Sequence, residues 1–187
     1  MTKTPVRFLI SGSRNYGPLS RVAEFVAAVA KKHPHATLVH GAAAGVDQAA
    51  ADAAIDAHLA VEPHPADWTR HGPSAGFRRN ERMVQVSSHV VAFWDEFSRG
   101  TAHAIACAAN AGKLRAVYGA TGKELPIEDA VRIAFKVCRR RPNRGAIAPE
   151  IRRLSGSQKK DPLDNSAPGR RMGTLDQRSS ALHRDAH

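Results

Sequence analysis

The chain has 187 residues, 42% of them hydrophobic, two cysteines and a formal net charge of +11 at pH 7. This length suits one domain with a sizeable core and is too short for two full domains. The cysteines have no CxxC or CxxH neighbours, which excludes a disulfide framework and a cysteine-ligated zinc site. No apolar run is long enough for a signal peptide or a membrane span, so we expect a reduced, cytoplasmic protein with no membrane contact.

Short apolar runs alternate with amphipathic segments along the first three quarters of the chain. The runs predict buried strands at 6–11, 36–40, 88–94 and 114–119, with a weaker strand at 59–65. The segments between and after them predict helices at 19–32, 45–58, 75–86, 101–111 and 127–138. Strands that alternate with helices predict an α/β fold with a parallel sheet of βαβ units.

The character of the chain changes near its last quarter. Residues 1–138 carry 16 basic and 12 acidic side chains, whereas residues 139–187 carry 12 and 5, so their net charges are +4 and +7. The second part also has few large apolar residues and several clusters of Pro, Gly and Ser. Such a composition cannot offset the entropy cost of ordering. We therefore expect a folded domain over 1–138 and a disordered basic tail over 139–187.

Glycine and polar residues gather where the predicted strands end. In a parallel sheet these carboxyl ends share one edge, where ligands bind. The residues at the four ends are Gly12, Ser13 and Arg14; Gly41, Gly45 and Asp47; Asp67 and Trp68; and Ser98, Arg99, Gly100 and Thr101. Each has a structural explanation by itself, as a turn, a strand end or a helix first turn. No GxGxxG or Walker A motif is present, so the prediction of a ligand site rests on their convergence.

The residue types at this edge are typical of phosphate recognition. Glycines let the backbone approach a ligand closely, and the hydroxyls of Ser98 and Thr101 lie at a predicted helix N-terminus, whose free N–H groups favour an anion. Arg14 and Arg99 can add bidentate contacts to phosphate. We therefore expect a phosphorylated ligand.

Two further residues, Arg79 and Asn80, lie at the start of the helix that follows the third strand and should reach the same edge. A solvated basic helix face is the alternative for this segment. Trp68 is predicted to lie in a loop, where it could stack on a base, whereas Trp94 closes an apolar strand and is expected in the core. No HExxH or GxSxG spacing occurs. We therefore expect no metal site, no additional cofactor and no Ser/His/Asp triad, and the orientation of His103, toward ligand or solvent, stays open.

Four motifs, in order, resemble the YspA/YpsA-type members of the SLOG superfamily, which also includes the Lonely Guy phosphoribohydrolases and the DprA/Smf-type DNA-processing proteins. They are "SGSRNYG", "VHGAAAGVDQAAADAA", "PADWTRHGPSAGFRRNERMV" and "VVAFWDEFSRGTAHAIACAANAG", within residues 6–120. The resemblance implies a Rossmann-like three-layer sandwich with a mostly parallel central sheet. It also implies a nucleotide or nucleotide-derived ligand, held by the strand-end residues with Arg79 and Asn80, and it suggests a homodimer.

The Lonely Guy signature PGGxGTxxE gives the resemblance a more specific test. Gly100 and Thr101 match its GT, and Arg79 falls where the catalytic arginine would lie, but the glutamate position is Ala104. Without that carboxylate, hydrolysis of an N-glycosidic bond lacks its obvious agent. We therefore expect a sensor or regulatory module. A phosphoribohydrolase with a relocated carboxylate is one alternative, and a DprA-like DNA-binding accessory protein whose tail contacts phosphates is the other.

Overall fold

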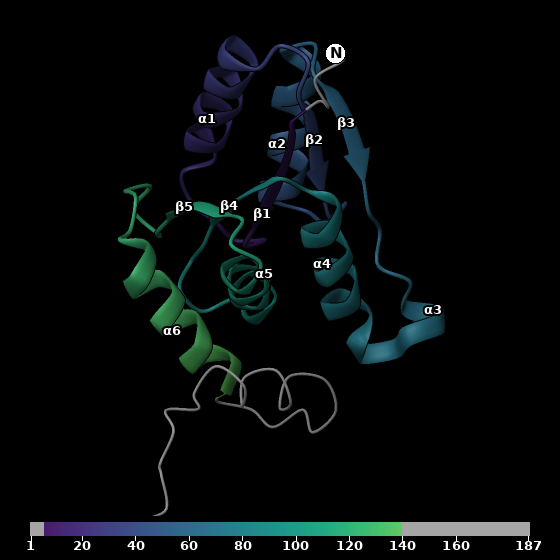
Figure 1. The fold of residues 1–187 in the computed structure, drawn as a ribbon, viewed down its shortest axis with the longest axis vertical. Helices are drawn as coiled ribbons and strands as arrows, with labels where there is room; N and C mark the ends of the chain where they lie inside the picture. The colour runs from purple at the N-terminus through teal and green to yellow at the C-terminus, as the bar shows by residue number, and fades with distance from the viewer. Residues whose placement is uncertain (1–5, 140–187) are drawn as a thin grey trace, which may run out of the picture.

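The computed structural model describes residues 6–139, and the predicted tail lies outside them from residue 140 onward. Five parallel strands form one sheet in the order β3-β2-β1-β4-β5 (Figure 1). The strands are β1 (Arg7–Gly12), β2 (Thr37–His40), β3 (Ala60–Pro63), β4 (His89–Phe93) and β5 (Leu114–Tyr118). The chain runs outward from β1 to β3 and then crosses to β4 on the other side of β1, so the strand order reverses between β1 and β4. The α/β prediction is confirmed, and every strand pairing in the sheet is parallel.

Helices cover both faces of the sheet. Helix α1 (Leu19–Lys32) packs beside α2 (Val46–Asp56) on one face, and α4 (Ala75–Val86), α5 (Arg99–Asn110) and α6 (Ile127–Arg139) pack on the other (Figure 1). Alternate residues of β1 enter the two cores: Phe8 and Ile10 join the α1–α2 side, and Leu9 joins the α4–α6 side. This two-sided burial explains why the strands read as continuous apolar runs. In the described part of the chain, no helix is long and apolar enough to cross a membrane.

The segment after β3 differs from the sequence prediction. It contains the short helix α3 (Trp68–His71) and the 3₁₀ turn η1 (Gly72–Ser74), where only a loop was predicted. The Asp67 carboxylate accepts a hydrogen bond from the Arg70 backbone N–H at 2.9 Å and caps α3. A four-residue helix shows no apolar periodicity, so the sequence pattern could not reveal it.

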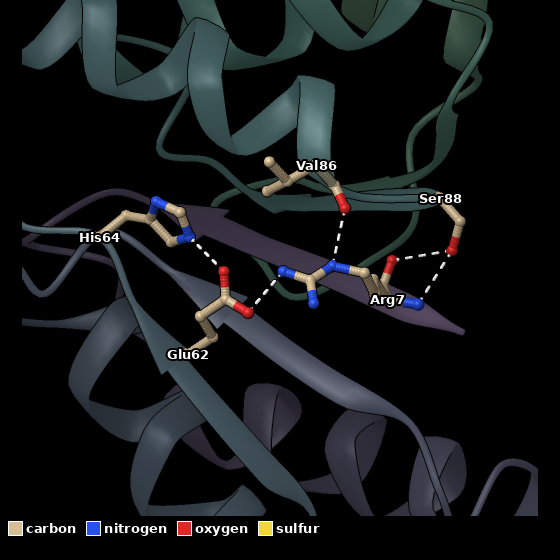
Figure 2. Close-up of polar contacts among 5 residues, drawn as sticks. All are labelled: Arg7, Glu62, His64, Val86 and Ser88. Carbon is tan, nitrogen blue, oxygen red and sulfur yellow. Dashed lines mark hydrogen bonds and ion pairs between the residues drawn. The ribbon is translucent and has the colours of Figure 1, made fainter. Parts of the chain in front are cut away.

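Arg7 at the start of β1 holds the far end of α4 against the sheet (Figure 2). Its Nε donates to the Val86 carbonyl at 2.7 Å, and its Nη2 pairs with Glu62 Oε2 at 2.5 Å. The other Glu62 oxygen contacts His64 Nε2 at 2.7 Å, and the hydrogen bond from Arg7, followed by that from His64, lowers the pKa of Glu62. The network thus ties the carboxyl end of α4 to β1 and β3, which orients the helix whose first turns carry Arg79 and Asn80.

Candidate functional site

A cleft of about 330 Å³ opens at the carboxyl end of the sheet, between β1, the start of α2, α4 and the start of α5. It is lined by Ser11, Gly12, Ser13, Arg14, Asn15, Ala43, Asp47, Arg79, Asn80, Met83, Ser98, Arg99, Gly100 and Thr101. Ten of the fourteen residues proposed from the sequence are therefore brought together, from four separate segments. Their role in ligand binding stays a prediction.

Asp47, in the first turn of α2, organises the loop that follows β2. Its Oδ2 accepts hydrogen bonds from the backbone N–H groups of Gly41 at 3.0 Å and Ala43 at 3.2 Å. Burial raises the pKa of this carboxyl, against the opposing effects of these hydrogen bonds and of the Arg79 charge. Asp47 is the one acidic residue among the described residues that line the cleft.

Arg79 and Asn80 join three elements across the cleft. The Arg79 guanidinium donates through Nη1 to the Gly41 carbonyl and through Nε to Asn80 Oδ1 at 3.0 Å. Asn80 Nδ2 in turn donates to the Gly100 carbonyl at 2.9 Å. Burial lowers the pKa of Arg79, and the nearby Asp47 carboxylate opposes that effect. The loop after β2, helix α4 and the start of α5 are therefore fixed relative to one another.

Asp95 shapes the turn between β4 and α5. Its Oδ1 accepts from the N–H groups of Phe97 at 3.0 Å and Ser98 at 2.7 Å, and its Oδ2 accepts from the Ser98 hydroxyl at 2.6 Å. Burial acts to raise the pKa of Asp95, but the hydrogen bonds from Ser98 and Phe97 outweigh it and hold the pKa below its ordinary value. The Asp95 N–H also donates to Ser13 Oγ at 3.1 Å. We call residues 98–101, which this turn presents to the cleft, the clasp.

Arg99 of the clasp carries polar atoms without a partner. Its Nε and Nη2 are buried, and neither has a hydrogen-bond partner within residues 6–139. The guanidinium lies near the end of α6, because its charge lowers the pKa of the Cys138 thiol against the larger raising effect of burial. Arg14, across the cleft, is exposed. The Arg99 residue is half-buried, with these two nitrogens enclosed and unpaired, and its backbone lies at the N-terminal end of α5.

Four predicted residues do not line the cleft. Gly41 and Gly45 lie behind its wall, where Gly45 packs against the Arg14 backbone. Asp67 caps α3, and Trp68 is 55% exposed, with its ring beside Gly76 at the start of α4. The expected core position of Trp94 is confirmed: the side chain is fully buried, and its Nε1 donates to the Ser98 carbonyl at 3.1 Å.

Sequence reasoning missed four lining residues: Ser11, Asn15, Ala43 and Met83. Asn15 lies inside the "SGSRNYG" motif, and Met83 lies one helical turn beyond Arg79 and Asn80, so their positions carried a usable signal. His103, whose orientation was open, is buried between α5 and α4 and does not line the cleft.

Comparisons with known proteins agree with the sequence resemblance. Residues 6–71 match the model of the YspA, cpYpsA-related SLOG family. The Gene 61 protein of Mycobacterium phage D29 is 35% identical over 113 residues, which cover 57% of this chain and 90% of that protein. A solved structure of DNA processing protein A from Helicobacter pylori, described for its single-stranded DNA binding mode, has 19% identity and a TM-score of 0.45, over 62% of this chain and 65% of that one. From the family model and the phage relative, the chain belongs to the YspA, cpYpsA-related SLOG family.

Proposed function

We propose that this protein binds a nucleotide or nucleotide-derived small molecule in the cleft, and that it acts as a sensor or regulatory module. The observation that carries the proposal is the Arg99 guanidinium, whose buried Nε and Nη2 lack partners within residues 6–139. Leaving such a group unpaired costs about 1–3 kcal/mol, and more when the group is charged. Because these two nitrogens are enclosed, an anionic ligand in the cleft would remove this cost by drawing the Arg99 side chain toward it.

The charge balance of the cleft favours a phosphate monoester. The lining contains three arginines, Arg14, Arg79 and Arg99, and one acidic residue, Asp47, which gives it a formal net charge of +2. A phosphate monoester carries about −1.5 to −2 at pH 7. The N-terminal end of α5 adds the favourable side of a helix dipole. Charge and donor geometry therefore support a phosphorylated ligand.

The carboxylates near the cleft support binding over hydrolysis. Asp95 uses both of its oxygens to hold the turn before α5, and the glutamate position of the related hydrolases is the buried Ala104. Among the residues that line the cleft, Asp47 is the remaining carboxylate on which a phosphoribohydrolase mechanism would have to rely. Its Oδ2 already accepts hydrogen bonds from two backbone N–H groups. The hydrolase alternative therefore predicts that free base is released and that Asp47→Asn abolishes this release.

A DNA-binding role is supported less well by the described residues. The cleft volume of about 330 Å³ is near the lower end of the range for small-molecule pockets, about 300–1,000 Å³, and suits one mononucleotide better than a strand. The residues outside the described range carry most of the excess positive charge, so nucleic-acid contact through the tail stays a separate prediction. The homodimer suggested by the resemblance also stays a prediction.

Arg99→Met tests the proposal, with Arg132→Met as the matched control on the exposed face of α6. Thermal unfolding is measured for each protein alone and with inorganic phosphate, ribose 5-phosphate and nucleoside monophosphates. Without ligand, Arg99→Met should be at least as stable as the natural chain, because two enclosed nitrogens without hydrogen-bond partners are replaced by apolar atoms. A ligand at about 100 times its Kd should stabilise the natural chain and the control by about 2.7 kcal/mol, and this stabilisation should be lost in Arg99→Met.

Two outcomes would contradict the proposal. One is that no phosphate-bearing compound stabilises the natural chain. The other is that Arg99→Met keeps the full ligand effect. The same samples, analysed for released base, separate a sensor from a phosphoribohydrolase.

A further inference from the structure

Phe97 is an exposed aromatic residue that directly precedes the clasp in the chain. Phe97 is 83% exposed, more than any other large hydrophobic residue in the described part of the chain. The next residue along the chain, Ser98, begins the clasp that lines the cleft. Core packing does not explain an aromatic side chain at this position.

The backbone around Phe97 is held in place. The Asp95 carboxylate accepts the Phe97 N–H at 3.0 Å, and Glu96 adopts a left-handed conformation with φ of 66°, which is unusual for a residue with a side chain. The buried Trp94 anchors the preceding end of the turn through its bond to the Ser98 carbonyl. The turn is therefore fixed on both sides of the residue that it exposes to solvent.

The cleft itself offers no ring for a nucleobase. None of its lining residues among those described is aromatic. Its apolar side chains are those of Ala43 and Met83. A nucleotide whose phosphate occupies the clasp would thus have to place its planar base at the rim. Trp68, the stacking residue expected from the sequence, lies beside Gly76 and does not line the cleft. Phe97 does not line the cleft either, but it directly precedes Ser98 of the clasp in the chain.

We propose that Phe97 is the base-stacking residue of this site, so that the ligand lies with its phosphate on the clasp and its base against the exposed ring. The inference rests on the proposed function and adds its ligand class: a phosphate joined to an aromatic base, with the base held outside the polar cleft. Stacking on an aromatic side chain tolerates any base, because every base has a π face. Phe97 therefore contributes affinity for the base and does not select among bases by hydrogen bonding.

The experiment compares two probes on the full chain by calorimetric titration: adenosine 5′-monophosphate, and ribose 5-phosphate, which lacks the base. Phe97→Ala should weaken the monophosphate by about 5- to 150-fold, the range that alanine substitution gives for one stacked base. The affinity for ribose 5-phosphate should change by less than about twofold, and Phe97→Trp should keep the monophosphate affinity. Ile55→Ala is the matched control, since it removes a 62% exposed apolar side chain at the opposite end of α2 from Asp47.

Four outcomes would overturn the inference while leaving the proposed function intact. Phe97→Ala could bind both probes as the natural chain does, or it could weaken both equally, which would indicate a structural role for the turn. Trp68→Ala could instead cause the base-specific loss. Sedimentation of the same variants tests a second copy of the chain as the occupant of this ring, and dissociation of a dimer by Phe97→Ala would also overturn the inference. If the natural chain binds neither probe, the proposed function fails and this inference fails with it.

Discussion

Gly45, just before α2, packs against the backbone of the loop that follows β1. Its φ is +82°, in the region that disfavours side chains, and a Cβ atom there would overlap the Arg14 carbonyl oxygen. Gly41 is confined in another way, because a Cβ atom there would overlap the Arg79 guanidinium and lie 2.8 Å from Asp47 Oδ2. The glycines thus position Arg14 and Arg79 without lining the cleft themselves.

Gly45→Ala should therefore destabilise the protein and displace Arg14. Gly112→Ala is the matched control, since Gly112 also has a positive φ, +66°, but has nothing within 4 Å of a Cβ atom. The control should lose about 1 kcal/mol from backbone strain, and Gly45→Ala should lose clearly more, because it adds a backbone overlap. Urea unfolding measures both losses. Equal losses would show that the Arg14 backbone moves away from the added Cβ atom without a cost in folding free energy.

At the scale of the elements, His103 lies in the contact between helices α4 and α5. It is buried in α5 against α4, where it contacts the Phe77 ring at 4.7 Å between centroids, Glu81 Oε1 at 3.7 Å and the Cys107 sulfur at 3.6 Å. Burial lowers the pKa of His103 to about 4. Glu81 favours the charged form, but its side chain is 47% exposed and its charge is screened by solvent, so burial dominates. The imidazole is therefore neutral in the folded protein near pH 7.

This pKa predicts acid sensitivity at the α4–α5 contact. In the unfolded chain a histidine takes up a proton near pH 6.5, whereas the folded protein resists protonation until about pH 4. Stability should therefore be unaffected above about pH 7 and fall as the pH decreases from about 6.5 to 4, by at most about 1.4 kcal/mol per pH unit from this residue. Lowered pKa values at His40 and His89, both mainly from burial, add to the fall in the same direction.

Urea unfolding across pH 4 to 8 checks the contribution of His103. His103→Leu should show a shallower decline than the natural chain, and His35→Leu, at an exposed position, should decline like the natural chain. If His103→Leu keeps the full pH dependence, another group is responsible for it.

At the scale of the whole molecule, the features that could be predicted from the sequence depend on the alternation of strands with helices and on the direction in which the strands run. The apolar runs identified all five strands, and their shared carboxyl edge placed ten of the proposed residues around one cleft. What could not be predicted depends on how helices rotate and pack. The burial of His103, the position of Trp68 beside Gly76 and the exposure of Phe97 all follow from contacts between segments distant in sequence.

The distribution of charge separates the two proposed binding activities within one chain. Residues 140–187 hold 11 basic and 5 acidic side chains, a net charge of +6, whereas the cleft belongs entirely to the described domain. A chain ending at Arg139 keeps every strand and helix described above. We therefore expect it to keep the phosphate-induced stabilisation of the full chain and to lose most of any affinity for single-stranded DNA, because that affinity depends on the number of phosphates neutralised.

Fluorescence anisotropy with a labelled oligodeoxynucleotide, at several salt concentrations, measures this loss. For the full chain, log K should fall steeply with log salt, by about 0.7 for each phosphate contacted. A full-length control separates charge from chain length, since replacing six basic residues by Gln brings the net charge of the segment to zero: Arg152, Arg153, Lys159, Lys160, Arg170 and Arg171. This control should bind DNA as weakly as the shortened chain. If the shortened chain instead keeps the affinity and salt dependence of the full chain, the folded domain is the nucleic-acid binder, and the DNA-processing alternative replaces the assignment of a small ligand.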